Sequence, residues 1–148
     1  MIKDTPRQKD TPRPMPISVK RVYEPAARAD GIRVLVDRLW PRGLSKTEAG
    51  IDEWFRDIAP SNELRKWFHA QPERWEIFRK RYLGELAASD AERHLQALRA
   101  LAQKRKHLTL LYASKNETHN NAIVLKDLLK GTSRLPRARS RSSKSPQP

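Results

Sequence analysis

The sequence of 148 residues contains no cysteine, which excludes a disulfide framework, a thiolate nucleophile and a thiolate metal site. It has no apolar run near the roughly 18 residues that a membrane-spanning helix needs, and residues 1–16 are too polar for a signal peptide. Acidic residues are scarce, because 17 Asp and Glu stand against 31 Lys and Arg, which gives a net charge of +14. We therefore expect a basic cytoplasmic protein with no membrane partner and, at this length, one folded domain.

The two ends of the chain have compositions that do not favour folding. Residues 1–16 contain the string KDTPR twice, and residues 132–148 are rich in Ser, Arg and Pro and contain no acidic residue. Proline and charge supply little apolar surface to offset the entropy lost on ordering. We predict a disordered N-terminal tail at 1–16, a folded domain at 17–131 and a disordered basic tail at 132–148.

The segment between the tails alternates strand and helix patterns. Residues 17–23 and 33–39 are short and rich in Val and Leu, and residues 108–113 form a continuous apolar run, which is typical of a central strand. Strands and helices in this order favour an α/β fold with a small, mainly parallel sheet flanked by helices. The predicted helices are 45–48, ended by Gly50; 63–68, capped by Ser61; one from Pro72 through Leu86; one from Ser89 to the basic run 104–106; and 122–129, ended by Gly131.

Two polar segments follow the second and third of these strands. The string DRLWPRG occupies residues 37–43, and SKNETHNN occupies residues 114–121. The carboxyl ends of parallel strands meet at one edge of a sheet, where loops and helix N-termini form ligand sites. We therefore expect the two segments to lie side by side around one pocket.

The residue types in these segments favour binding of a small anionic or nucleotide-like ligand. Arg38, Arg42 and Lys115 are suited to grip an anion. Asp37 can orient an arginine or accept a hydrogen bond from the ligand, and His119 can act as a general acid or base near neutral pH. Whether the site only binds or also catalyses stays open. The other candidate ligand-binding residues are Trp40, Asn120 and Asn121.

A purely structural interpretation of the same residues also stays open. Asp37 can pair with an arginine inside the fold, and Trp40 can pack in the core. Asn120 or Asn121 can satisfy buried backbone groups at the start of the last helix.

No other chemistry has a clear motif. The four histidines are not at metal-ligand spacing, and the dinucleotide and P-loop glycine motifs are missing. We therefore predict no metal and no cofactor.

The competing function is nucleic-acid binding or regulation. Between residues 65 and 82 basic side chains alternate with aromatic residues, as in surfaces that grip phosphates and unstacked bases. Aromatic residues at helical spacing also pack into a core, which is the alternative explanation. The C-terminal tail is expected to bind polyanions weakly and without sequence preference. The aromatic residues concerned are Trp67, Trp75, Phe78 and Tyr82.

Several strings in this sequence resemble the YeaO-like proteins, domain of unknown function family 488. The resemblance spans residues 17–131, and DRLWPRG at 37–43 is its most diagnostic string. It implies a small, mostly bacterial, cytosolic α/β domain with Rossmann-like layering, and it implies no established activity. The other strings are KRVY at 20–23, APS at 59–61, WFH at 67–69, RY at 81–82 and HNNA at 119–122.

The chain departs from the wider family at one point in the second polar segment. Relatives tend to carry Cys-His-Arg where this chain has Thr118, His119 and Asn120. A covalent mechanism based on that thiol does not carry over, and only the histidine is retained.

Overall fold

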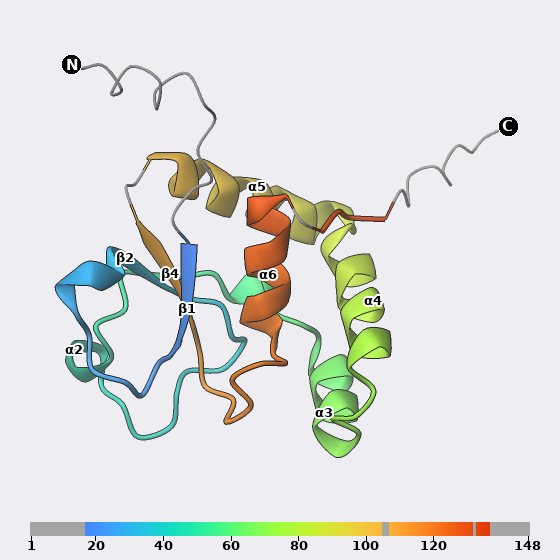
Figure 1. Cartoon of the computed structure of the whole chain (residues 1–148), viewed down its shortest axis with the longest axis horizontal. Helices are drawn as coiled ribbons and strands as arrows, with labels where there is room; N and C mark the ends of the chain where they lie inside the picture. Colours follow the sequence, from blue (N-terminus) through green and yellow to red (C-terminus); the bar gives the residue numbers. More distant parts are fainter. Residues whose placement is uncertain (1–16, 105–106, 132, 137–148) are drawn as a thin grey trace, which may run out of the picture.

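The computed structural model describes residues 17–104, 107–131 and 133–136, so most of both predicted tails and part of the 104–106 basic run lie outside the described residues (Figure 1). The elements in chain order are β1 (Ile17–Arg21), η1 (Arg28–Asp30), β2 (Ile32–Leu35), α2 (Lys46–Ala49), β3 (Glu53–Trp54), η2 (Arg56–Ile58), α3 (Asn62–Ala70), α4 (Trp75–Leu86), α5 (Ser89–Lys104), β4 (Leu108–Tyr112) and α6 (Asn121–Lys130).

The four strands form one parallel sheet in the order β1-β4-β2-β3. The prediction that the apolar run 108–113 forms a central strand is confirmed, because β4 pairs with β1 on one side and β2 on the other. The sequence missed β3, which has two residues and is too short to show an alternating pattern. The α/β class with a small parallel sheet is confirmed.

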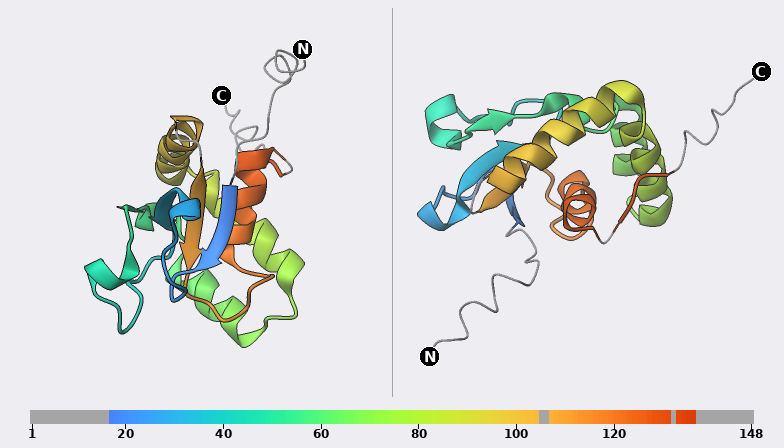
Figure 2. Two further views of the ribbon diagram at one scale, coloured as in Figure 1. Left: turned by 60° about the vertical axis from the view of Figure 1, so that its left-hand side comes forward. Right: turned by 90° about the horizontal axis from the view of Figure 1, so that it is seen from above.

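One face of the sheet is apolar and is covered by the three long helices. Successive side chains of a strand point to opposite faces of the sheet. Val34 and Val36 belong to the large core cluster together with residues of α4, α5 and α6, whereas Leu35, between them, belongs to a second cluster. In the left view of Figure 2, α4 and α6 lie on one side of the sheet and α2 on the other. The predicted stripe on α4 is confirmed, with Phe78, Tyr82 and Leu86 almost fully buried.

The second face of the sheet carries a buried ionic network. Asp30 accepts hydrogen bonds from Lys20 at 3.0 and 3.1 Å and forms an ion pair with Arg33. Arg33 also donates to the backbone carbonyls of Gly50 and Ala49, at 2.8 and 2.9 Å. Every side chain of this network has a partner, as burial of charge requires.

Capping residues set most helix ends where the sequence predicts them. Ser45 and Gly50 close α2 at its two ends, Ser61 caps α3, and Gly131 ends α6 in a left-handed conformation. The prediction that Pro72 opens a helix is wrong. Pro72 lies in the turn that follows α3, and α4 starts three residues later at Trp75.

Two residues assigned to the C-terminal tail contact the domain. The hydroxyl of Ser133 accepts a hydrogen bond from Arg79 at 3.3 Å, and its backbone N–H donates to the backbone carbonyl of Asp127 at 3.1 Å. Leu135 packs against the main core cluster. In the described ranges, no helix combines the length and the apolar character needed to cross a membrane.

Candidate functional site at the carboxyl edge of the sheet

The two polar segments meet at the carboxyl edge of the sheet, and Asp37 joins them. Its Oδ2 accepts a hydrogen bond from the N–H of Ala113 at 2.9 Å, and its Oδ1 accepts one from Nδ2 of Asn121 at 3.1 Å. Asn121 also donates to the carbonyl of Val36 at 2.9 Å. Residues 37–43 and 113–120, called the carboxyl-edge loops below, therefore meet at Asp37, although the residues bonded there are 76 and 84 positions apart in the chain.

The environment of Asp37 disfavours its charge. Burial raises the pKa of the Asp37 carboxyl, and the hydrogen bonds from Ala113 and Asn121 and the positive charge of Arg65 offset this only in part. No ion pair with Asp37 is found among the described residues. The carboxyl therefore acts mainly as a link between the two loops.

Arg38 and Trp40 are held by protein groups. The Arg38 guanidinium donates to the carbonyls of Pro60 at 3.2 Å and Ala59 at 3.0 Å. Trp40 donates its indole N–H to the carbonyl of Leu44 at 2.7 Å and packs edge-on against Trp54, with ring centroids 5.3 Å apart. Both residues therefore fix the shape of the first loop, as the structural interpretation expects.

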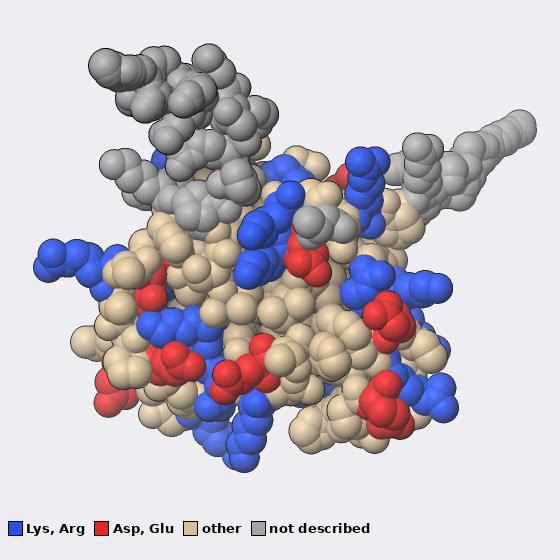
Figure 3. Space-filling model, in the orientation of Figure 1, with Lys and Arg blue, Asp and Glu red and all other residues tan. Residues whose placement is uncertain are grey.

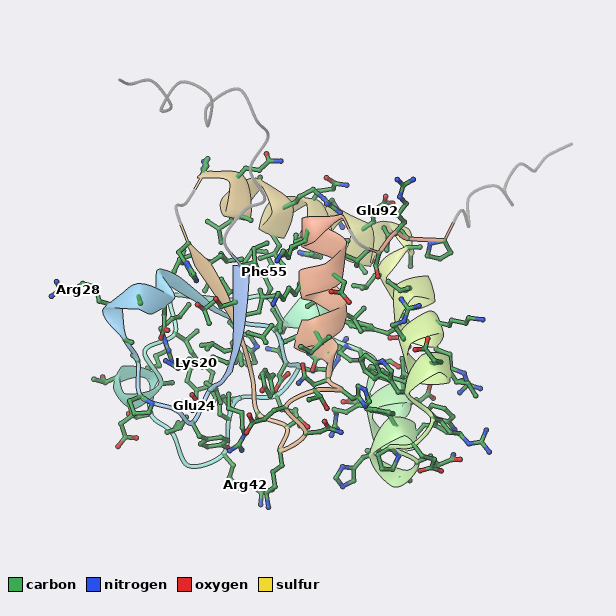
Figure 4. The ribbon with its side chains drawn as sticks, viewed as in Figure 1. Lys20, Glu24, Arg28, Arg42, Phe55 and Glu92 are labelled. Carbon is green, nitrogen blue, oxygen red and sulfur yellow. The ribbon has the colours of Figure 1, made fainter. Side chains whose placement is uncertain are left out.

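Arg42 and Lys115 point into solvent from different loops. Both are exposed, and neither side chain has a hydrogen-bond or ion-pair partner within the described ranges. Figure 4 shows the Arg42 side chain projecting from the end of the molecule where the strands finish. Figure 3 shows basic side chains gathered along the same lower edge, with acidic side chains just above them.

Contacts through β1 connect the loop of Arg42 to the loop of Lys115. The hydroxyl of Tyr23 donates to the carbonyl of Arg42 at 2.9 Å. The guanidinium of Arg21 lies over the Tyr23 ring, 5.1 Å from its centroid, and donates to the carbonyl of Ser114 at 2.9 Å. The two exposed cations are thus mounted on one connected structure.

Asn116 and Asn120 shape the turn before α6. Oδ1 of Asn116 accepts from the N–H groups of Thr118 and His119 at 3.1 and 2.9 Å. Asn120 is 3% exposed, donates to the carbonyl of Asn116 at 2.8 Å, and caps α6 by accepting from the N–H of Ile123. Asn120 therefore has a structural role whatever the loops bind.

His119 lies flat against Trp75 at the start of α4. The ring centroids are 4.6 Å apart and the planes differ by 14°. The residue is exposed, and its ring nitrogens have no hydrogen-bond partner in the described part of the chain. No carboxylate orients the imidazole there, so the arrangement lacks the second member of an acid-base pair.

The sequence analysis missed a polar group beneath these loops. Glu85 of α4 accepts from the N–H and hydroxyl of Ser61 at 2.8 and 2.6 Å, and Tyr82 donates to the carbonyl of Ile58 at 2.6 Å. Burial raises the pKa of Tyr82 well above its ordinary value, and the charges of Asp37 and Glu85 act in the same direction. The available signal was Glu85 itself, a carboxylate three residues from Tyr82 on the buried side of α4.

The basic and aromatic region of α3 and α4 is largely a core face. Phe78 is 2% exposed and Tyr82 is 0% exposed, so neither can stack with a base. Arg81 covers Trp67, with its guanidinium 4.5 Å from the ring centroid. Among the described residues, no group of three or more His, Asp and Glu side chains is placed to hold a metal ion.

The fold and these loops define a small parallel α/β domain with a polar carboxyl edge, and comparison with known proteins places it in a family. The DUF488-N3i family, described as the inactive DUF488-N3 subclade, matches residues 16–147, so the chain belongs to the DUF488 family. The resemblance found in the sequence is thereby confirmed. No solved structure matches the chain.

Curated bacterial relatives match most of the domain. The uncharacterized protein YeaO of Escherichia coli K12 is 51% identical over 118 residues, which are 78% of this chain and 98% of that protein. An uncharacterized protein of Mycobacterium bovis is 43% identical over 115 residues, 78% of this chain and 94% of its own length. An uncharacterized protein of Mycobacterium tuberculosis has the same identity and coverage.

Proposed function

We propose that this domain binds a small anionic ligand at the carboxyl-edge loops and does not itself catalyse a reaction. One observation carries the proposal: Arg42 and Lys115, two exposed cations without protein partners among the described residues, stand on loops that Asp37 joins. Cations that a fold needs for its own stability are usually paired, as Lys20 and Arg33 are here. Unpaired cations on loops that hydrogen bonds hold in place are suited to bind an anion from solution.

The candidate site residues fall into two groups, according to whether their polar groups are already hydrogen-bonded within the protein. The polar groups of four of them are already bonded within the protein, so these residues support the loops and leave contact with the anion to Arg42 and Lys115. The four are Arg38, Trp40, Asn120 and Asn121. Binding without catalysis is supported by three features. Thr118 cannot supply a thiol, His119 lacks an orienting carboxylate in the described residues, and the matching subclade is described as inactive.

The proposal is tested by calorimetric titration of the full chain with ribose 5-phosphate, inorganic phosphate and citrate. An exposed ion pair contributes up to about 1 kcal/mol, so the Arg42→Ala/Lys115→Ala double variant should bind the preferred anion roughly 10- to 30-fold more weakly. Arg28→Ala is the matched control, because Arg28 is an exposed cation on η1, away from Arg42 (Figure 4). The Arg28→Ala variant should bind the anion with the same affinity as the wild type.

Two results would contradict this function. Either no anion of the panel binds, or the double variant and the Arg28→Ala control lose affinity equally. In the second case the +14 net charge, and not a site, attracts the anion.

A further inference from the structure

The imidazole of His119 forms the outer ring of an aromatic stack that begins in the core. Phe78 is buried and lies 5.7 Å from Tyr82 and 4.3 Å from Phe68, and in both pairs the rings are stacked. Trp75 stacks on Phe78 at 5.7 Å, and His119 stacks on Trp75 at 4.6 Å. The stack therefore runs from a fully buried ring to an exposed one.

This stack fixes the plane of the His119 ring. Trp75 is partly buried and belongs to the rings that pack against the main core, so it cannot turn freely. The loop between β4 and α6 lies next to α4 in the left view of Figure 2, in agreement with the stacking of His119 on Trp75. The N–H of His119 is held by Asn116 at 2.9 Å, so backbone and ring are both restrained.

The contacts of His119 that the described residues make involve one ring face and neither ring nitrogen. One face rests on Trp75, the residue as a whole is exposed, and no described residue hydrogen-bonds to the imidazole. A flat ring held rigidly at the surface is the usual platform for an aromatic heterocycle, because stacking then costs little further side-chain entropy. Lys115 stands four positions before His119, so a cation and the exposed ring belong to one short loop.

We infer that the anion bound at the carboxyl-edge loops carries an aromatic heterocycle, as a nucleoside monophosphate does, and that this heterocycle stacks on the outer face of His119. This inference rests on the proposed function, since Arg42 and Lys115 hold the phosphate. His119 then acts as a binding surface and not as an acid or base. The ligand is recognised in two independent parts, by charge at the cations and by ring stacking at the histidine.

The experiment compares adenosine 5′-monophosphate with ribose 5-phosphate, which has the same phosphate and sugar and no base. Both are titrated calorimetrically into the full chain. Stacking of one base strengthens binding by roughly 10-fold or more, so the wild type should prefer the nucleotide by about that factor. His119→Ala should reduce the nucleotide affinity to that of ribose 5-phosphate and leave the affinity for ribose 5-phosphate unchanged.

Two further variants separate stacking from folding. His119→Phe keeps a flat ring on Trp75 without ring nitrogens and should retain most of the preference for the nucleotide. His69→Ala removes another exposed histidine, on α3, and should behave as the wild type does. A preference lost in His119→Ala and kept in His119→Phe identifies the ring face as the binding element.

The inference fails if both ligands bind the wild type equally, or if His119→Ala weakens both to the same degree. It also fails if His119→Phe loses the preference as completely as His119→Ala. Failure of the proposed function gives a different pattern, in which neither ligand binds or the Arg42→Ala/Lys115→Ala double variant binds both as the wild type does.

Discussion

Two aspartates stand at opposite ends of β2, and their surroundings differ. Asp30 precedes the strand, is 8% exposed, and is neutralised by Lys20 and Arg33. Asp37 follows the strand and is held by neutral donors, the N–H of Ala113 and the amide of Asn121. At the first end Lys20 and Arg33 are paired with Asp30 inside the fold, whereas Arg42 and Lys115 at the second end remain exposed. The first end is built for stability, and the second is suited to binding.

The largest effect is expected from Asp30→Asn. Removing one partner of a buried ion pair leaves Arg33 buried and uncompensated, which should lower the free energy of unfolding by about 3–5 kcal/mol. Chemical denaturation measures this change. Asp90→Asn is the matched control, because it breaks an exposed pair with Arg93 and should cost less than about 1 kcal/mol. Equal losses in the two variants would show that the buried network has no special role.

Asn121→Ala should have an intermediate effect. It removes the donor to the Val36 carbonyl and to Asp37 at a partly buried position, and unsatisfied groups of this kind cost about 1–3 kcal/mol. Denaturation should give a loss in this range, smaller than that of Asp30→Asn. A variant as stable as the wild type would mean that the two loops are not joined through Asn121.

Asp37→Asn should lower the free energy of unfolding by less than about 1.5 kcal/mol near neutral pH, because the lost hydrogen bond is offset by removal of a disfavoured charge.

The stability loss in Asp37→Asn should change with pH in the direction opposite to the loss in Asp30→Asn. Burial raises the pKa of Asp30, but hydrogen bonds from Ala27, Lys20 and Arg33 outweigh burial, and the net pKa is lowered from the ordinary 3.8. The contribution of Asp30 is therefore present above this pH and is lost as the pH falls through the folded-state pKa.

The pKa of Asp37 is raised in the folded state, so its contribution runs the other way. It is present below the ordinary pKa of 3.8 and is lost as the pH rises through the higher folded-state value. As the pH is lowered, the loss in free energy of unfolding relative to the wild type should grow for Asp37→Asn and shrink for Asp30→Asn. Urea titrations at several pH values measure both trends, and parallel trends would refute the assigned difference between the two carboxylates.

The smallest effect on stability is expected from Arg42→Ala. The bond from Tyr23 reaches the Arg42 backbone, so the substitution keeps it, and the free energy of unfolding should stay within about 0.5 kcal/mol of the wild type. A larger loss in chemical denaturation would mean that the arginine is structural, which would remove the basis of the proposed site.

Local patterns predicted most of the fold because each depends on neighbouring residues. The apolar run of β4 and the caps at Ser45, Ser61 and Gly131 are in this group. Strand β2 ends at Leu35, earlier than residue 39, because the chain then turns into the first carboxyl-edge loop. The start of α4 was wrongly predicted at Pro72, because a proline fits a tight turn as well as the first turn of a helix.

The ionic network could not be predicted from local patterns because its members come from separate elements. The one available signal was Arg33, a charge inside an otherwise apolar strand, which requires a buried partner that the sequence does not identify. The predicted meeting of the two polar segments followed from strand topology, and the structure adds the side chain that joins them, Asp37. Which cations stay unpaired depends on tertiary contacts and could be read only from the structure.

The central claim is that the two carboxyl-edge loops form one anion site. The most direct test is an NMR titration of the ¹⁵N-labelled full chain with ribose 5-phosphate. We predict that the amide shift changes concentrate in residues 42–43 and 114–119, which are far apart in sequence, and that Arg42→Ala diminishes the changes in both segments. Shift changes confined to α3 and α4, or confined to one of the two loops, would contradict the account.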